Sequence, residues 1–366
     1  MIYLDNAATT KPDPLFIEAA NETMREMWGN PSSSHAWGEK AAARLQKSRE
    51  MAARAIGAKP EQIIFTSSGT EANQLALNFG CNIFASRIEH PSILANPYED
   101  VLVDEEGLIW EDILESQLEY AKNHCLPNIF CVQMVNSETG VWQDVERLTR
   151  IIHDSNGLVH CDAVQAFPHF RIDVNELNVD TLSISGHKFG CAPGVGLLYA
   201  KDPDQIYPLI VNSQEFGLRG GTENLPYIYG MACMMQKVTE QDYDALEQRY
   251  IDFDECLLNT FTRERLDFRF NGVQVTYAIR SVGFNGVDGM QLAEALSEHG
   301  IMVSTGSACS SGEHEISSVL RAMHVPDEYA KGTIRISFCP ETTMEDVQMA
   351  ANAIAANVRL LGGKLR

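Results

Sequence analysis

Short apolar segments alternate with longer amphipathic segments over the first two thirds of the chain. The apolar segments have the length of buried strands and lie at residues 63–65, 82–85, 101–103, 129–135, 158–161, 181–185 and 195–200. Apolar residues at helical spacing predict helices at residues 13–27, 36–56, 70–79, 110–121 and 145–153. Short continuous apolar strands between helices are typical of a mostly parallel sheet that is covered on both faces. We therefore expect a large α/β domain over residues 12–240.

The pattern changes after residue 240. Between residues 242 and 264, apolar side chains recur at helical spacing and predict one long amphipathic helix. Shorter segments follow, with strands expected at residues 268–270, 276–278, 281–284 and 333–338 and helices at 290–299, 317–323 and 344–361. Residues 241–366, together with residues 1–11, are expected to form a smaller α+β domain.

The composition is that of a globular protein with an acidic surface. Of the 366 residues, 45% are hydrophobic and 21% are charged, and the formal net charge is −22. Such a surface repels phosphate backbones and anionic lipids, so we expect neither nucleic acid nor a membrane as a partner. No apolar run reaches the ~18 residues of a membrane-spanning helix, and the N-terminus lacks the basic and apolar regions of a secretory signal.

The nine cysteines occur without a CxxC pair. An odd number of cysteines without such a motif, in a chain of this length, favours reduced thiols over a disulfide framework or a zinc site. We therefore expect a cytoplasmic protein without a bound metal.

Two charged residues follow apolar strands. Lys188 comes shortly after the segment 181–185, and Asp162 comes directly after 158–161. Lys188 is either an ordinary loop lysine that extends to solvent or a desolvated amine suited to a Schiff base. Asp162 is either an ion-pairing or capping residue or the carboxylate that faces a protonated pyridine nitrogen. Pyridoxal 5'-phosphate (PLP) needs both groups, and ligands of α/β sheets bind at such strand ends.

Residues 66–71, with the sequence TSSGTE, are a candidate phosphate site because they follow a strand and begin a helix. Backbone N–H groups at a helix N-terminus bind anions, and a glycine allows the ligand to approach closely. The same segment also fits a simple helix cap, since Ser68 and Glu71 have the spacing of a capping box. Ser185 and His187 would add donors to the same phosphate, and the glycine-rich turn at 219–224 is a weaker second candidate.

In this order along the chain, these motifs resemble those of a known family. The sequence is similar to PLP enzymes of the class V aminotransferase fold and, within them, to cysteine desulfurases of the NifS/IscS type. The similarity includes YLDNAATT at 3–10, GNPSS at 29–33 and TIRIS at 333–337. It implies a PLP-dependent transferase of fold type I, the aspartate aminotransferase-like fold, that binds PLP and forms a homodimer.

The resemblance implies a role at the cofactor for five residues. Lys188 forms the Schiff base and later moves protons between the substrate and the cofactor. Asp162 keeps the pyridine nitrogen protonated, and Gln165 hydrogen-bonds the ring 3-oxygen. His90, which without the family would be an ordinary loop histidine, stacks on the ring and acts as an acid or base toward the substrate. Asn136 lies near the 3-oxygen and the substrate carboxylate.

The resemblance also implies how the phosphate is held. Its ligands are expected to be Gly69, Thr70, Ser185 and His187. Thr222 is expected to reach the phosphate of the cofactor in the other subunit, which is why the family pattern implies a dimer.

The resemblance makes L-cysteine the substrate and L-alanine the product. Arg335 binds the α-carboxylate, although an arginine that solvates a strand edge would show the same pattern. Cys309 is the nucleophile that takes the sulfur as a persulfide. It lies in the Ser/Gly-rich segment 304–312, which cannot bury a thiol well, so the alternative is an exposed cysteine without function. The sulfur then passes to a protein acceptor such as a scaffold for iron–sulfur cluster assembly.

Three other functions share most of these motifs. A selenocysteine lyase is the nearest alternative, and a class V aminotransferase would not need Cys309. A non-catalytic PLP-binding regulatory protein is disfavoured because Lys188, Asp162, Arg335 and Cys309 are all intact. We therefore predict a PLP-dependent cysteine desulfurase.

Overall fold

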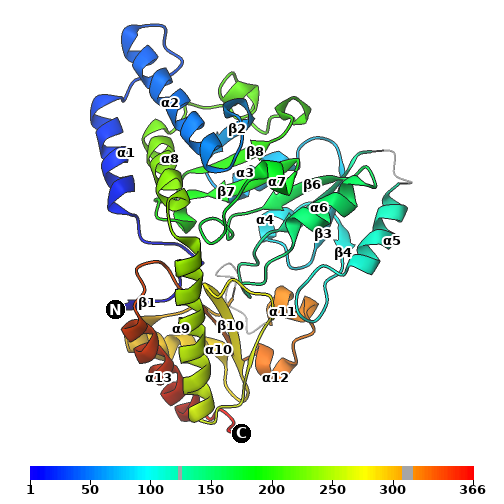
Figure 1. The fold of residues 1–366 in the computed structure, drawn as a ribbon, viewed down its shortest axis with the longest axis vertical. Helices are drawn as coiled ribbons and strands as arrows, with labels where there is room; N and C mark the ends of the chain where they lie inside the picture. Colours follow the sequence, from blue (N-terminus) through cyan, green and yellow to red (C-terminus); the bar gives the residue numbers. More distant parts are fainter. Residues whose placement is uncertain (123–125, 307–315) are drawn as a thin grey trace.

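The computed structural model describes residues 1–122, 126–306 and 316–366. Its larger sheet, in the upper part of Figure 1, has seven strands. In spatial order they are β2 (Ile63–Thr66), β8 (Gly196–Ala200), β7 (Thr181–Ser185), β6 (Leu158–Asp162), β5 (Asn128–Gln133), β3 (Asn82–Ser86) and β4 (Glu99–Val101). Neighbours from β7 to β4 are parallel, whereas β8 is antiparallel to both β7 and β2. The expected mostly parallel sheet is confirmed.

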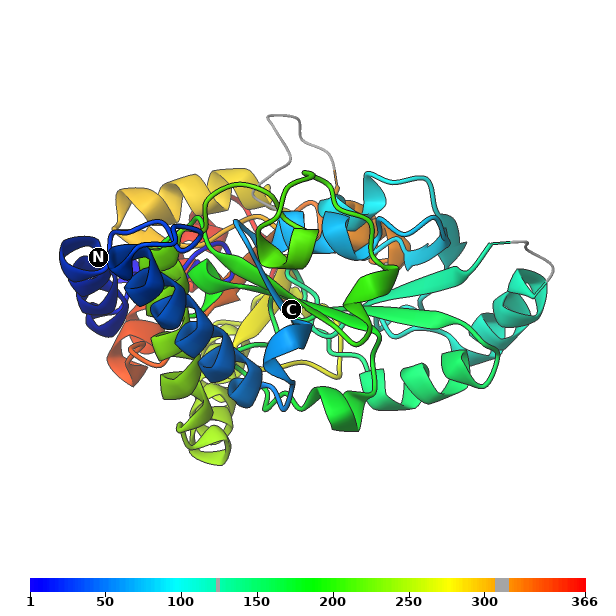
Figure 2. The same cartoon turned by 90° about the horizontal axis from the view of Figure 1, so that it is seen from above.

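Helices cover both faces of this sheet, as Figure 2 shows. They include α1 (Pro14–Glu26), α2 (Ala36–Ala55), α3 (Gly69–Ala76), α5 (Glu111–Ala121), α6 (Val145–His153) and α8 (Leu225–Thr239). Local sequence sets the ends of these helices. At α1, for example, the Asp13 side chain accepts a hydrogen bond from the N–H of Leu15 at 2.8 Å, and Pro14 takes the first helical position. Because both faces are covered, β2, β7 and β8 are buried along their whole length.

A second, smaller core packs along α9 (Tyr243–Arg263), in the lower part of Figure 1. Its antiparallel sheet has the order β12 (Thr333–Ser337), β10 (Ile279–Phe284) and β9 (Phe268–Phe270), and α10 (Gly289–Glu298) and α13 (Met344–Leu360) pack beside it. The N-terminal strand β1 (Ile2–Tyr3) pairs in parallel with β11 (Ile301–Met302). Ile2 and Leu4 are buried in this second core. The division at residues 12 and 240 itself stays a prediction.

The expected strand at 276–278 is wrong. Residues Tyr277 and Ala278 form a turn, and the N–H of Thr276 donates to the carbonyl of Gly140 at 2.9 Å. The N–H of Thr276 therefore joins the second core to the larger domain, whereas the carbonyl of Ala278 accepts from the N–H of Phe338 at 2.8 Å within the second core. The described chain also contains the short α-helices α4 (Pro91–Leu94), α7 (Val174–Leu177), α11 (Ser318–Ala322) and α12 (Asp327–Ala330). None of the helices in the described ranges is long and apolar enough to span a membrane.

Candidate active site

The carboxyl ends of the parallel strands β3, β5, β6 and β7 meet at one edge of the sheet, and a cavity of about 280 Å³ lies there. Asp162 ends β6, and Lys188 follows β7 by three residues. Because β6 and β7 are parallel neighbours, they bring the two side chains to the same cavity. The predicted residues that line it are Gly69, Thr70, His90, Asp162, Gln165, Ser185, His187, Lys188 and Arg335.

Asp162 is buried and held by hydrogen bonds to both carboxylate oxygens. Oδ1 accepts from the N–H of Val164 at 3.0 Å, and Oδ2 accepts from Nδ2 of Asn73 at 2.8 Å. Because a carboxylate only accepts, these bonds fix its orientation toward the cavity.

Asn73 on α3 connects several groups at the floor of the cavity, and the sequence patterns did not predict this role. Its Nδ2 also donates to Ser92 Oγ at 2.8 Å, and its Oδ1 accepts from His160 Nε2 at 3.0 Å and from Ser183 Oγ. The signal that was available is an amide within the otherwise apolar buried face of α3. A polar residue in such a face needs hydrogen-bond partners inside the protein, and the partners of Asn73 are the side chains around Asp162.

His90 is oriented by Ser92 in the next turn of the chain. The backbone N–H of Ser92 donates to His90 Nδ1 at 3.1 Å, and Ser92 Oγ lies 2.7 Å from the same nitrogen. Burial and the nearby charge of Lys188 lower the pKa of His90. A neutral ring that accepts at Nδ1 carries its proton on Nε2. His90 therefore offers the cavity an N–H donor.

Lys188 Nζ donates to the carbonyls of Ala7 and Ala8 at 2.6 and 2.9 Å. Gln165 Nε2 donates to the same Ala7 carbonyl at 2.8 Å. The N-terminal segment therefore forms one wall of the cavity beside the amine. The adjacent His187 has a pKa lowered to about 4 by burial and by the charge of Lys188, which keeps its ring neutral.

The N-terminus of α3 has the features of an anion site. A Cβ at Gly69 would lie 2.7 Å from Val164 Cγ2, so only glycine leaves this surface open without a shift of its neighbours. Ser185 Oγ is buried and has no hydrogen-bond partner among the described residues. A hydroxyl in this state needs an external acceptor or donor.

The capping box expected here is only half formed. Ser68 Oγ does accept from the N–H of Glu71 at 3.1 Å. The Glu71 carboxylate, however, accepts from the N–H of Ser67 at 2.7 Å and pairs with Arg219 at 2.8 Å. Glu71 thus ties the glycine-rich turn at 219–224 to the start of α3 instead of capping it.

Three predicted residues are not among the described lining of the cavity. In the described part of the chain, the Nδ2 of Asn136 donates instead to the Ile88 carbonyl at 3.0 Å, and its Oδ1 accepts from two N–H groups of its own turn. Thr222 is exposed and, within the described residues, lies outside the cavity lining. Cys309 falls outside the described residues.

Glu89 is a further cavity residue, and no sequence motif assigned it a role. Its Oε1 accepts from the N–H of Gln133 at 2.9 Å and from Ser86 Oγ at 3.2 Å. Its Oε2 is buried without a hydrogen-bond partner in the described ranges. Burial, helped by the charge of Asp162, raises the pKa of this carboxyl well above its ordinary value, so Glu89 is held in its neutral form.

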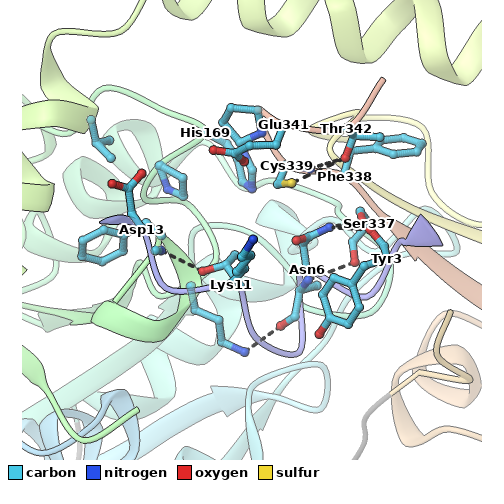
Figure 3. A pocket seen from close by; sticks show the side chains of 18 of the residues that line it. Tyr3, Asn6, Lys11, Asp13, His169, Ser337, Phe338, Cys339, Glu341 and Thr342 are labelled. Atoms are coloured by element: carbon cyan, nitrogen blue, oxygen red, sulfur yellow. Dashed lines mark hydrogen bonds between the residues drawn. The ribbon is translucent and has the colours of Figure 1, made fainter. Parts of the chain in front are cut away.

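A larger cavity of about 520 Å³ adjoins the first one and is shown in Figure 3. The two share Ala7, Gln165 and Lys188, which form their common boundary. The larger cavity is lined by Tyr3, Asn6, His169, Phe338 and Cys339, among others, and within the described chain its lining lacks both Asp162 and His90. The chemistry therefore converges on the smaller cavity.

Comparison with known proteins agrees with this geometry. Residues 2–349 match the family model described as Aminotransferase class-V. The chain is 35% identical to "Cysteine desulfurase IscS" of Dictyoglomus turgidum in an alignment of 374 positions that covers 96% of this chain and 93% of that protein. A solved structure named "NIFS-LIKE PROTEIN" superposes with a TM-score of 0.89 at 30% identity and covers 98% of this chain and 100% of that chain. Another, named "SspA in complex with cysteine", gives a TM-score of 0.80 at 27% identity and covers 94% of this chain and 100% of that chain.

Proposed function

The chain belongs to the class V aminotransferase family and, within it, to the cysteine desulfurases, and we propose that it converts L-cysteine to L-alanine and transfers the sulfur to its own Cys309. The observation that carries the proposal is the convergence of Lys188, Asp162, His90 and Arg335 on one cavity. The similar SspA structure, which was solved in complex with cysteine, supports cysteine as the substrate.

Enzymes of this family use PLP, and the residues of the smaller cavity fit it. Ser185 Oγ, buried without a partner among the described residues, and the open surface at Gly69 suit the phosphate. Asp162 suits the pyridine nitrogen, and Lys188 Nζ is the amine that would hold the aldehyde carbon. When bound, PLP supplies an electron sink for the negative charge that develops on the substrate Cα.

The side chains of this protein then divide the remaining work. Asp162, fixed by Asn73 and Val164, holds a proton on the pyridine nitrogen. Lys188 Nζ moves the proton of the substrate Cα, and the charge-assisted pair with Arg335 orients the α-carboxylate. His90 presents Nε2–H to the reacting groups, because Ser92 occupies Nδ1.

Cys309 takes the sulfur. Its thiolate attacks the sulfur of the substrate, an S–S bond forms and the Cβ–S bond breaks, and the electron pair returns to the carbon skeleton that becomes alanine. Cysteine and the enzyme thiol thus give alanine and an enzyme persulfide without an external oxidant. The described residues on either side of the segment that contains Cys309 support this role. Ser304, which precedes it, forms a backbone bridge with Arg335, and Ser318 and Val319, which follow it, line the cavity.

The test is the fate of L-cysteine with purified, PLP-loaded protein and dithiothreitol. We expect alanine and sulfide in equal amounts, and added sulfur on the peptide that contains Cys309 by mass spectrometry. Cys309→Ala should still bind PLP but reduce sulfide release to background, since it lacks the accepting thiol. Cys256→Ala is the matched control, because this thiol lies on α9 against Gln348, outside the lining of the cavity within the described chain. Normal sulfide release by Cys309→Ala would refute the proposal.

We further propose a homodimer in which Thr222 reaches the active site of the other subunit. Thr222 is exposed and follows a loop with large exposed apolar side chains. These side chains are Tyr207, Leu209, Ile210, Val211 and Phe216. Apolar side chains of this size, gathered on one loop, are typical of a protein interface.

The persulfide must finally leave the enzyme. A protein acceptor such as an iron–sulfur scaffold, in the cytoplasm, fits the Ser/Gly-rich sequence around Cys309 and the thiol chemistry of the chain. The seven cysteines that the structure describes are free thiols, which suits a reducing compartment.

A further inference from the structure

The guanidinium of Arg335 is already paired with a protein carboxylate at the cavity. Arg335 Nη2 lies 2.7 Å from Asp5 Oδ1, and the two side chains are 3% and 22% exposed. On the other side, Nη1 donates to the carbonyl of Ser137 at 2.8 Å. Two protein oxygens therefore hold the guanidinium from two directions.

Asp5 is itself fixed with respect to the strand that carries Arg335. The N–H of Ser337 on β12 donates to the Leu4 carbonyl at 2.8 Å, and Asn6 Nδ2 donates to the Ser337 carbonyl at 2.9 Å. The N–H of Ala7 donates to Ser337 Oγ at 2.9 Å. Figure 3 shows Asn6 and Ser337 side by side in this arrangement. The carboxylate of Asp5 thus belongs to a segment that hydrogen bonds hold against β12.

The remaining donors of Arg335 are available to a ligand. A guanidinium has five N–H donors in a planar fork, and Arg335 Nε is buried without a hydrogen-bond partner in the described chain. Arg335 also lines the cavity. Asp5 and Ser137 already hold the plane of the guanidinium. The Arg335 side chain therefore loses little conformational entropy when a carboxylate binds to it.

We propose that Asp5 is a positioning residue for the substrate carboxylate: it holds Arg335 in the orientation that binds the α-carboxylate of L-cysteine. This inference rests on the proposed function. Asp5 touches neither the reacting sulfur nor the cofactor in this scheme, so its effect is on substrate binding and not on the chemical step.

The test separates KM from kcat. Asp5→Ala should raise the KM for L-cysteine by about tenfold to a hundredfold, the range of a lost charge-assisted hydrogen bond, with kcat within about threefold. The absorbance of the bound cofactor should be unchanged. Asp5→Asn keeps an oxygen acceptor for Nη2 and should restore most of the KM. In an Arg335→Ala background, Asp5→Ala should have no further effect on KM, because the group that it positions is missing.

Asp254→Ala is the matched control. Asp254 pairs with Arg280 at 2.6 Å, and the two side chains are 13% and 6% exposed, so a similar buried pair is broken. In the described chain neither residue lines either cavity. Both alanine variants should lower the melting temperature, but only Asp5→Ala should raise KM.

Three outcomes would overturn the inference. They are a wild-type KM in Asp5→Ala, an equal rise of KM in Asp254→Ala, and an effect of Asp5→Ala that persists in the Arg335→Ala background. Release of alanine by the wild type is the separate test of the proposed function. If the wild type makes no alanine from L-cysteine, the proposed function fails, whereas an active wild type with an unchanged Asp5→Ala refutes the role of Asp5 alone.

Discussion

Burial keeps two side chains near the cavity, His160 and Glu89, in their uncharged forms. It shifts their pKa values in opposite directions. Burial lowers the pKa of His160 to about 4, because the protonated ring is the charged form. Burial raises the pKa of Glu89 well above its ordinary value, because the carboxylate is the charged form. Both groups therefore act as fixed neutral hydrogen-bonding residues near Asp162.

The substitution Glu89→Gln tests whether Glu89 is neutral in the folded protein. The ordinary pKa of a glutamate side chain is 4.5. At this pH, Glu89 is protonated in the folded protein and half ionised in the unfolded chain. As the pH rises, the unfolded chain loses this proton while the folded protein keeps it, so the wild type loses stability. Glutamine cannot ionise. The variant should therefore become progressively more stable than the wild type as the pH rises above the ordinary pKa of glutamate.

The measurement is urea unfolding of the cofactor-free protein at several pH values. Glu18→Gln makes the same substitution at an exposed position and serves as the control. A difference between Glu89→Gln and wild type that stays constant with pH, or that shrinks as the pH rises, would contradict a neutral Glu89.

At the scale of elements, the turn after β5 joins the larger domain to the second core. Gly140 in this turn has φ +76°, and an added Cβ would overlap the carbonyl oxygen of Ile279 at the start of β10. The same turn accepts the N–H of Thr276 at the Gly140 carbonyl. Only glycine permits both the left-handed backbone and this close approach.

Gly140→Ala should accordingly destabilise the protein. Gly362→Ala is the matched control, because Gly362 has φ +85° but no described atom within 4 Å of an added Cβ. The control should cost about 1–2 kcal/mol for the backbone conformation alone. Gly140→Ala should cost about 1–3 kcal/mol more, because of the added overlap. Urea unfolding measures both, and equal costs would show that the approach of β10 to the turn is not tight.

At the scale of the whole molecule, the exposed apolar loop at 207–217 is the surface on which the proposed dimer depends. Val211 in this loop is 82% exposed, and Leu360 at the end of α13 is 81% exposed. Arg219, just beyond the loop, pairs with Glu71 at the start of α3. An interface at this loop would therefore be connected directly to the anion site.

Val211→Asp should convert the dimer to a monomer, because an unpaired carboxylate in an apolar interface costs several kcal/mol. Sulfide release should fall with it, since each site would lose the contribution of Thr222 from the other subunit. Leu360→Asp introduces the same charge at an equally exposed position and should leave both properties unchanged. Analytical ultracentrifugation measures the mass. A Val211→Asp protein with the same mass and activity as Leu360→Asp would exclude this surface as the interface.

Local sequence patterns were sufficient to predict most helices and strands and the residues that follow the strand ends. The apolar runs at 158–161 and 181–185 predicted β6 and β7, and with them the positions of Asp162 and Lys188. Helical spacing predicted α9 and α13 closely. Spacing along the chain determines which face of an element is apolar, so these properties can be inferred without knowledge of the partners. The family resemblance rested on the same motifs and is confirmed by the match over residues 2–349.

Only the tertiary structure decided which of these residues meet. Asp5 and Arg335 are 330 positions apart, and Asn73 lies 89 positions from Asp162, yet both pairs are in direct contact. Residues 277–278 form a turn and not the predicted strand, and the N–H of Thr276 just before them bonds to Gly140 of the larger domain. Pairings of this kind depend on strand order and on the packing of the two cores against each other, which no local periodicity encodes. The sequence alone thus determined the elements and their chemistry, and the fold determined their contacts.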